Sequence, residues 1–298
     1  MRKKKNLLSV RDLTIYDVKN IIKLASQYLK NKTVNNLALQ NKTIINLFFE
    51  NSTRTLVSFE MAAKSLGANV ITLPIKSSSL NKGESLKDMV KALNAMNPDY
   101  MVIRQENSSI LNVLATHLNC SLINAGNGGG EHPTQALADY LVISNHKKQI
   151  KNLKIVICGD ILHSRVARSN IRLLKMFGAK ICLVAPPTLI YRYFSEVDSA
   201  YYSLIEGIKD ADVIMLLRLQ KERMNNNYFI PSAKEYFYLY GLDLQKLSYA
   251  KSNVIVMHPG PVNREIEIGG DIADHVILQQ VEFGLAIRKA VLYYYNSC

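Results

Sequence analysis

Short, dense apolar runs alternate with helical patterns along this chain, and the alternation constrains its fold more than any other feature. Residues 43–49 (TIINLFF) form one such run, and Leu56, Phe59, Ala63 and Leu66 then recur at three- and four-residue intervals. Runs this dense are typical of strands covered on both faces, as in parallel sheets joined by crossover helices. The pattern predicts an α/β fold with doubly wound parallel sheets.

The alternation occurs twice, on either side of a polar, basic stretch near residues 145–152. Strands are predicted at 43–49, 68–74, 100–104 and 121–126, then at 153–160, 179–186, 212–218 and 253–259. Helices are predicted at 15–29, 53–66, 84–96 and 110–118, from 133 onward, and at 164–178 and 274–295. We therefore expect two consecutive domains with a junction within 133–152.

Composition excludes several classes of protein. The chain has 298 residues, 48% of them hydrophobic, so it can bury a large core. No apolar run approaches the ~20 residues of a membrane-spanning helix, and the start MRKKKNLLSVRDL lacks the apolar segment of a signal peptide. The cysteines form no C-x-x-C pair and predict reduced thiols in a cytoplasmic protein, with two of them buried in strands. The four are Cys120, Cys158, Cys182 and Cys298, and the two in strands are Cys158 and Cys182.

The net charge of +13 leaves two interpretations open. A strongly basic protein can bind nucleic acid. However, the lysines are spread along the chain, and we find no zinc finger, aromatic RNA-binding motif or sustained basic helix. The sequence favours a basic surface with a few cations for a small anion, and nucleic-acid binding is the weaker alternative.

The polar turn after the first apolar run has the chemistry of an anion site. Ser52, Thr53, Arg54 and Thr55 stand where the helix of 53–66 begins. A helix start offers unpaired backbone N–H groups and the positive end of the helix dipole. A serine or threonine there is also an ordinary cap, but a cation such as Arg54 is unfavourable unless an anion is bound.

Polar groups follow nearly every other predicted strand as well. In open α/β sheets ligands bind beyond the carboxyl ends of the strands, so these groups are candidates for one site. Taken singly, each could instead be a structural ion-pair partner or a packed histidine, and His163 is best read that way. The candidates are Arg104, His132, Gln135, Asp160, Arg165, Arg218, Gln220, His258, Gly260, Pro261, Asn263 and Arg264.

Several familiar site motifs are absent from the sequence. GNGGG at 126–130 is not the dinucleotide fingerprint, because Glu131 occupies its last position, and no Walker A or G-x-S-x-G sequence occurs. Metal-ligand spacings are equally poor. The sequence predicts no cofactor and no metal.

A series of motifs in order along the chain resembles the aspartate carbamoyltransferase family, whose catalytic chains it matches over about residues 7–295. The motifs are ENSTRT with SFE, SSSLNKGES, VIR, NAGNGGGEHPTQALADY, GDILHSRVARSN, LRLQKER and MHPGPVNREIEI. The resemblance implies transfer of the carbamoyl group of carbamoyl phosphate to L-aspartate, an early step of pyrimidine synthesis. It also implies two domains with the active site in the cleft between them, 1–133 for carbamoyl phosphate and 134–280 for aspartate, with helix 281–298 returning to the first.

The resemblance also implies roles for individual residues. Ser52, Thr53, Arg54 and Thr55 would hold the phosphate, while Thr55, Arg104 and His132 would surround the carbonyl oxygen. Gln135 and the backbone near Gly260 and Pro261 would orient the carbamoyl NH2. Arg165, Arg218 and Gln220 would bind aspartate, and Lys82 would reach in from a neighbouring subunit of a homotrimer. The PGPVNR form resembles members without zinc-bearing regulatory chains, so no such partner is expected.

Some positions depart from the commonest family pattern. Leu56 stands where Arg is usual, Gln105 and Glu106 stand where His is frequent, and Asn127 and Gly129 stand where Asp and Lys are often found. None is an implied ligand, so activity should survive. The alternative enzyme is ornithine carbamoyltransferase, but the residues after the last strand read His-Pro-Gly-Pro, and Arg165 with Arg218 suits a dicarboxylate. We further expect the polar segment 220–236 to be a loop that closes over substrate.

Overall fold

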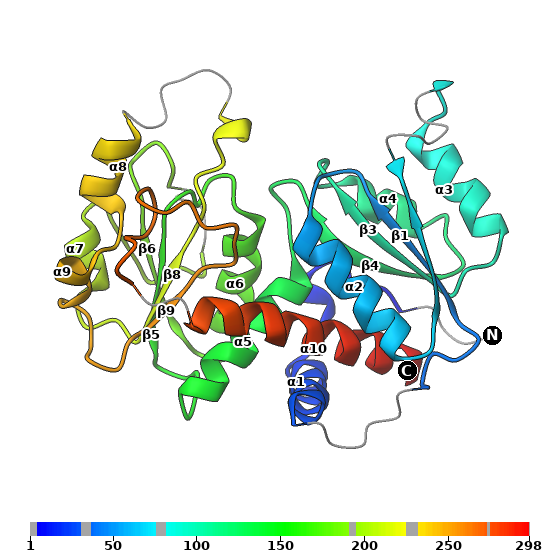
Figure 1. Cartoon of the computed structure of the whole chain (residues 1–298), viewed down its shortest axis with the longest axis horizontal. Coiled ribbons are helices and arrows are strands. Elements are labelled where there is room, and N and C mark those ends of the chain that lie inside the picture. The colour runs from blue at the N-terminus through cyan, green and yellow to red at the C-terminus, as the bar shows by residue number, and fades with distance from the viewer. Residues whose placement is uncertain are drawn as a thin grey trace. The chain divides into compact units, whose positions relative to one another are not determined.

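The computed structural model describes residues 5–30, 37–75, 82–190, 195–224, 232–272 and 275–297. The chain divides into two compact units, drawn in Figure 1: unit 1 comprises residues 1–138 and 282–298, and unit 2 comprises residues 139–281. The two divisions fall inside helices α5 (Pro133–His146) and α10 (His275–Ser297). The boundary predicted at 133/134 lies at the start of α5.

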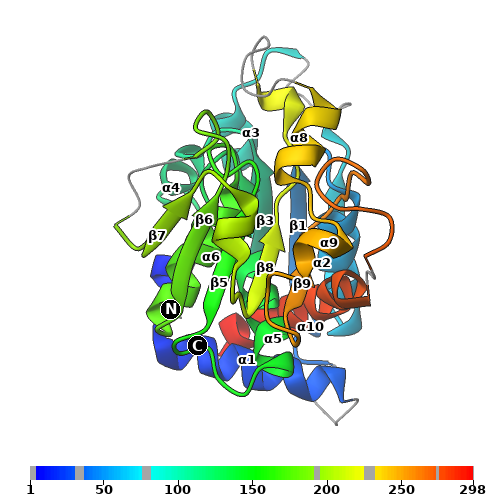
Figure 2. The same cartoon turned by 90° about the vertical axis from the view of Figure 1, so that its left-hand side faces the viewer.

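Unit 1 holds a four-stranded parallel sheet in the order β2-β1-β3-β4. Its strands are β1 (Thr43–Phe48), β2 (Asn69–Leu73), β3 (Tyr100–Gln105) and β4 (Ser121–Asn127). Its helices include α1 (Ile15–Leu29), α2 (Thr53–Ser65), α3 (Leu86–Ala95) and α4 (Ile110–Ala115). Figures 1 and 2 show α2 and α4 on opposite faces of this sheet, as the dense apolar runs predict.

One face of the unit 1 sheet packs against α3 and α4. In the strand register Ile45 lies opposite Met101 and Leu47 opposite Ile103, so these side chains point to the same side. Their buried cluster also contains Met89 and Val90 of α3 and Leu111 and Leu114 of α4. Burial of each such side chain contributes roughly 1.5–3 kcal/mol, so this face anchors the strands whose ends carry polar groups.

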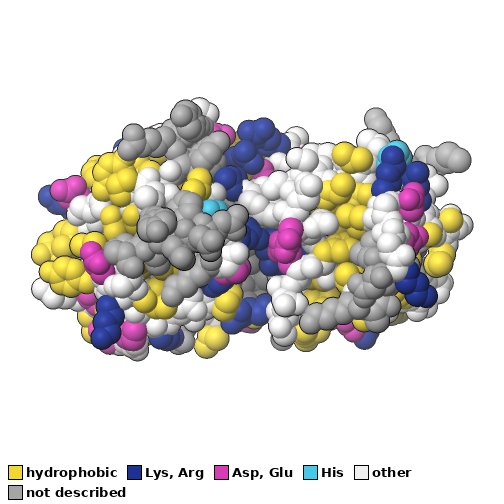
Figure 3. Space-filling model, turned by 90° about the horizontal axis from the view of Figure 1, so that it is seen from above, with side chains coloured by type: hydrophobic (Ala, Val, Ile, Leu, Met, Phe, Trp, Pro, Cys, Tyr) yellow, Lys and Arg dark blue, Asp and Glu magenta, His cyan; other side chains and the backbone are white. Residues whose placement is uncertain are grey.

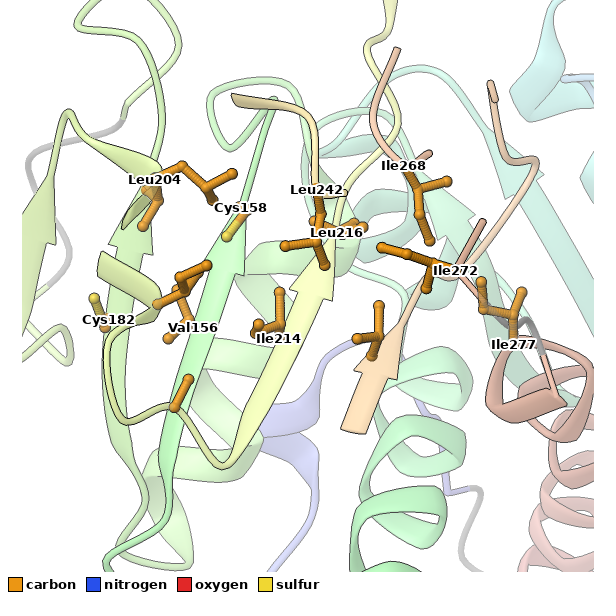
Figure 4. Packing of buried hydrophobic residues seen from close by; sticks show 14 residues of the cluster. Val156, Cys158, Cys182, Leu204, Ile214, Leu216, Leu242, Ile268, Ile272 and Ile277 are labelled. Atoms are coloured by element: carbon orange, nitrogen blue, oxygen red, sulfur yellow. The ribbon is translucent and has the colours of Figure 1, made fainter. Parts of the chain in front are cut away.

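Unit 2 holds a five-stranded parallel sheet in the order β7-β6-β5-β8-β9. Its strands are β5 (Lys154–Cys158), β6 (Lys180–Val184), β7 (Ser199–Tyr201), β8 (Val213–Leu216) and β9 (Ile255–Met257). Its helices include α6 (Arg165–Met176), α7 (Leu204–Ile208), α8 (Ala233–Tyr240) and α9 (Leu244–Leu247). Figure 4 shows Val156, Ile214 and Leu216 in the buried cluster that lines one face of this sheet.

All eight predicted strands are present, and the predicted α/β class with two parallel sheets is confirmed. The prediction of a loop over 220–236 is wrong at its C-terminal end, because α8 begins at Ala233 with Ser232 as its cap, whereas near its N-terminal end a 3-10 turn spans Lys221–Arg223. Residues 225–231 of that segment lie outside the described residues. The short elements β7, α7 and α9 were not predicted, because three to five residues carry too little periodicity.

Cysteine burial follows the prediction. Cys158 and Cys182 are buried, and burial raises the pKa of both thiols. Cys298 lies outside the described residues. Within the described ranges no helix is long and apolar enough to cross a membrane, and no group of three or more His, Cys, Asp or Glu is arranged to hold a metal ion. Figure 3 shows Lys and Arg side chains in separate patches, with Asp and Glu between them, on the face that it draws.

The two ends of the chain meet in unit 1 at Asp17, which is 8% exposed. Its carboxylate accepts a hydrogen bond from the Tyr294 hydroxyl of α10 at 2.5 Å and another from the Thr14 hydroxyl at 2.7 Å, and it pairs with the Lys5 ammonium at 3.2 Å. Burial acts to raise the pKa of Asp17, but these hydrogen bonds outweigh it and hold the pKa well below its ordinary value.

We expect Asp17→Asn to lower the free energy of unfolding at pH 7 by on the order of 2–3 kcal/mol. Because the folded pKa is depressed, the contribution of the carboxylate is present above its unfolded pKa and is lost as the pH falls toward the folded value. The difference between wild type and variant should therefore shrink below about pH 4. Urea titrations at pH 7 and pH 3 measure it. Asp210→Asn, at an exposed position, is the control, and an equal loss in both variants would contradict the prediction.

Candidate functional site

The carboxyl ends of three neighbouring strands of unit 1 carry the first group of predicted site residues. Strand β1 lies between β2 and β3, and β4 follows β3, all of them parallel. Ser52, Thr53, Arg54 and Thr55 follow β1, Arg104 lies in the last two residues of β3, and His132 and Gln135 follow β4. The topology therefore brings all seven to one edge of one sheet.

The N-terminus of α2 has no side-chain cap from its N-cap residue. Ser52 is the N-cap residue but its side chain makes no cap hydrogen bond, and the first turn contains no acidic residue. Ser or Thr side chains do cap α1, α3, α6, α7 and α8 of the same chain. The first-turn N–H groups of α2 thus lack the side-chain acceptor that its cap residue could supply.

Arg54 stands in the first turn of α2, with an exposed side chain. No other described residue forms an ion pair or hydrogen bond with its guanidinium. A cation held at the positive end of a helix without an acidic partner is unfavourable in the free protein. The arrangement becomes favourable when a dianion accepts bonds from both the guanidinium and the helix amides.

Arg104 is held by an ion pair that the sequence did not reveal. Its Nε donates to Glu50 Oε2 at 3.1 Å, and the two side chains are only 12% and 10% exposed. Its Nη1 donates to the Ala125 carbonyl oxygen at 3.4 Å, on the neighbouring strand β4. Glu50 follows β1, so the pair fixes the Arg104 guanidinium between the ends of β1 and β4.

His132 and Gln135 open helix α5. His132 is 3% exposed, and its carbonyl oxygen accepts hydrogen bonds from the amides of Gln135 and Ala136 at 3.0 and 3.2 Å. The side chain of Gln135 is half-buried in the first turn. Lys82 differs from this group, because it follows the edge strand β2 and is exposed just before α3.

A second group of predicted site residues lies at the carboxyl ends of three neighbouring strands of unit 2. Arg165 follows β5, Arg218 and Gln220 follow β8, and Gly260 and Pro261 follow β9, in the strand order β5-β8-β9. Arg165 is 8% exposed and is the first residue of α6, which Ser164 caps by accepting from the Ala167 amide at 3.1 Å. The bond between Gly260 and Pro261 is cis.

Arg218 is paired with Glu222 one turn later in the chain. Arg218 Nη1 donates to Glu222 Oε2 at 3.1 Å, and a second bond joins Nη2 to Oε1. These hydrogen bonds, donated by Arg218 to the Glu222 carboxylate, raise the pKa of Arg218. The Glu222 side chain is 56% exposed. Replacement of Glu222 by another carboxylate on Arg218 therefore costs little free energy.

Two buried carboxylates hold the loop that carries Arg218 and Gln220: Asp160, which the sequence predicted as a candidate, and Glu267, which it did not. Glu267, 2% exposed, accepts from the Leu219 amide at 2.9 Å, and fully buried Asp160 accepts from the Gln220 amide at 3.2 Å. Glu267 also accepts from the Asn263 amide and side chain, both at 2.8 Å. The two acids therefore fix the ends of β5, β8 and β9 relative to one another.

The chemistry of the two groups differs. The unit 1 group combines a helix N-terminus, hydroxyls and guanidinium groups, which suits a phosphate and a polarised carbonyl oxygen. The unit 2 group presents two guanidinium groups and an amide, which suits carboxylates. Neither group contains an activated nucleophile of the Ser-His-Asp kind among the described residues.

Comparison with known proteins gives a consistent result along the chain. Residues 5–145 match the family described as aspartate/ornithine carbamoyltransferase, carbamoyl-P binding domain, and residues 151–295 match its Asp/Orn binding domain. The aspartate carbamoyltransferase catalytic subunit of Wolbachia sp. subsp. Brugia malayi is 78% identical over 298 residues, covering 100% of both chains. That of Ehrlichia canis is 55% identical over 298 residues, covering 98% of this chain and 97% of the other.

Solved structures agree on the fold. Aspartate transcarbamoylase from Trypanosoma cruzi, crystallised with carbamoyl phosphate and aspartate, has a TM-score of 0.85 at 29% identity, covering 98% of this chain and 95% of that one. Ornithine carbamoyltransferase from Pyrococcus furiosus also has a TM-score of 0.85, at 26% identity, with 97% and 96% covered. The fold alone thus does not separate the two acceptor substrates, whereas the sequence relatives named above are aspartate enzymes.

Proposed function

Since this chain belongs to the aspartate/ornithine carbamoyltransferase family, we propose that it transfers the carbamoyl group of carbamoyl phosphate to the amine of L-aspartate. The products are N-carbamoyl-L-aspartate and phosphate, in an early step of pyrimidine biosynthesis. The observation that carries the proposal is the full-length identity of 78% to an aspartate carbamoyltransferase catalytic subunit. The two guanidinium groups at the ends of β5 and β8 support aspartate over ornithine, because a dicarboxylate needs cations.

Unit 1 is the carbamoyl-phosphate half in this proposal. The open N-terminus of α2, with Ser52, Thr53 and Arg54, binds the phosphate group. Thr55, Arg104 and His132 donate to the carbonyl oxygen, and Gln135 orients the carbamoyl NH2 together with the backbone at Gly260 and Pro261. The Arg104–Glu50 pair at 3.1 Å supports this role, because it fixes the guanidinium before substrate arrives.

Unit 2 is the aspartate half. Arg165, Arg218 and Gln220 bind the two carboxylates, and an incoming carboxylate takes the place of Glu222 on Arg218. The exposure of that ion pair supports the exchange, since surface pairs contribute only about 0–1 kcal/mol. Lys82 enters the site from a neighbouring subunit of a homotrimer, and its exposed position beyond the edge strand β2 supports this role.

The chemistry is an acyl transfer between two bound anions. The neutral amine of aspartate attacks the carbonyl carbon, a C–N bond forms, and a tetrahedral oxyanion develops. Donors fixed around that oxygen each contribute about 3–4 kcal/mol in comparable sites. The C–O bond to phosphate then breaks, phosphate leaves with the electron pair, and the amine proton passes to it. Alignment of the two substrates supplies much of the remaining acceleration.

The test is product formation from carbamoyl phosphate with aspartate or with ornithine, in the presence of a chelator. We expect carbamoyl aspartate only. Carbamoyl ornithine alone would keep the phosphate half and overturn the assignment of Arg165 and Arg218. Absence of both products from folded protein would overturn the proposed activity. Sedimentation of the same sample tests the homotrimer, and a monomer that remains active would contradict the donation of Lys82.

A further inference from the structure

The corner between β4 and α5, residues 124–132, is held together by the side chain of Asn127. Asn127 is buried, with 6% of its surface exposed. Its Oδ1 accepts from the Glu131 amide at 2.6 Å and from Asn124 Nδ2 at 3.2 Å. Its Nδ2 donates to the Ser108 carbonyl oxygen at 2.6 Å. Accepting from an amide and donating to a carbonyl together determine which side-chain atom is oxygen and which is nitrogen.

The same corner is joined to residues 105–109, which comprise the last residue of β3 and the loop that follows it. Besides the bond from Asn127 to Ser108, the Gly128 amide donates to the Gln105 carbonyl oxygen at 2.7 Å. A Cβ on Gly128 would lie 1.8 Å from the Glu106 carbonyl oxygen, so the two backbones touch. Arg104 directly precedes this loop, and His132 ends the corner. Asn127 therefore connects the backbone segments that carry these two proposed donors.

The N-terminal segment supports the corner from the other side. Ser9 Oγ donates to Glu131 Oε1 at 2.9 Å, and the Val10 amide donates to Oε2 at 3.4 Å. Asn124 Nδ2 donates to the Leu8 carbonyl oxygen at 2.7 Å. The backbone of Leu7 bridges β4 at Ile123, so the segment runs alongside the strand that leads into the corner. Residues more than 110 positions apart thus fix one turn.

From this network we propose that Asn127 is a positioning residue for the reaction. Its side-chain amide fixes the backbone that carries His132 relative to the backbone that carries Arg104. Glu131 anchors the corner to Ser9. The inference rests on the proposed function, because both donors act on the carbamoyl carbonyl oxygen. An alanine at 127 removes both the acceptor for the Glu131 amide and the donor to the Ser108 carbonyl oxygen, so two backbone groups at the corner lose their partner.

The test compares Asn127→Ala with Asn46→Ala in steady-state assays varying each substrate. Asn46 is fully buried in unit 1, and its Nδ2 donates to Thr72 Oγ1 at 3.2 Å inside the sheet, away from the corner. We expect kcat of Asn127→Ala to fall at least about 10-fold, while the KM for aspartate changes less than about 3-fold, because unit 2 holds that substrate. Asn46→Ala should lose thermal stability with kcat within about 2-fold of wild type.

Ser9→Ala carries the test if Asn127→Ala does not fold, with Ser9→Thr as the conservative variant. It removes the hydroxyl that donates to Glu131 and that also accepts from the Arg11 amide at 3.0 Å, a second bond that threonine keeps as well. We expect kcat to fall about 3-fold in Ser9→Ala and to recover in Ser9→Thr. An unchanged kcat in folded Asn127→Ala, or an equal fall of kcat in both asparagine variants, overturns the inference. Activity of the wild type in the same assays would still support the proposed function. Inactive wild type overturns both.

Discussion

Arg54→Ala should lower kcat/KM for carbamoyl phosphate by about 10²–10³-fold and leave the fold intact. The activity falls because the guanidinium stabilises both the bound phosphate and the charge that develops on it as it leaves. Stability should stay within about 0.5 kcal/mol of wild type, because the exposed side chain forms no ion pair or hydrogen bond with the rest of the described chain. Steady-state kinetics and urea unfolding of the same preparation measure the two quantities.

Lys64→Ala is the matched control for Arg54→Ala. Lys64 is an exposed cation in the last turn of the same helix, paired with Glu60 at 2.6 Å. Its removal changes the net charge equally but leaves the N-terminus of α2 untouched, so activity should remain within about 2-fold of wild type. A similar loss of activity in both variants would assign the effect to overall charge. Full activity of Arg54→Ala would show that α2 does not bind the phosphate.

The second large effect is expected in unit 2. Arg165→Met and Arg218→Met should each lower kcat/KM for aspartate at least about 100-fold, because a charge-assisted hydrogen bond contributes ≈ 1.5–3 kcal/mol and each guanidinium can form two. Methionine keeps most of the length of the side chain, which limits the cavity left by buried Arg165. Carbamoyl phosphate affinity, measured by calorimetry, should change less than about 3-fold.

Lys175→Met provides the control on α6. Lys175 lies in the last turn of that helix and pairs with Asp198 at 2.6 Å, whereas Arg165 is in the first turn. Its kcat/KM for aspartate should match wild type within about 2-fold. A different result would contradict the assignment of carbamoyl phosphate to unit 1 and aspartate to unit 2. That result is a loss of carbamoyl phosphate affinity in the two arginine variants as large as their loss of kcat/KM for aspartate.

The candidate site residues that can be proposed from the sequence alone are those whose chemistry is local. Arg54 at a helix start and Arg165 after a buried strand can be recognised as candidate ligands by residue type and position, because the carboxyl ends of parallel strands lie at one edge of the sheet. The strands were predictable because β1 and β5 are buried along most of their length and are therefore mostly apolar, with Thr43 and Asn46 in β1 and Lys154 in β5 as the exceptions.

The residues that the sequence did not reveal are the partners of those ligands. Glu50 pairs with Arg104 across 54 positions, and Glu131 accepts from Ser9 across 122. No periodicity encodes such pairs, since the tertiary fold chooses them. In the sequence, Asn127 stood out only because it departs from the commonest family pattern. Its hydrogen bonds in the structure support the positioning role proposed above. Helix α8 was predictable in principle, because Ser232 caps it by accepting from the amide of Glu235.

The meeting of both chain ends in unit 1 has a consequence for biosynthesis. Tyr294 and Asn296 of α10 bond Asp17 and the Ala38 carbonyl oxygen, at 2.5 and 2.8 Å, so the first unit is completed by the last helix. Unit 2, continuous over 139–281, has all its residues outside the ribosome earlier than unit 1. The unit whose synthesis begins first is therefore the one completed last, and a released chain truncated after residue 281 should carry one protease-resistant domain, unit 2, rather than two.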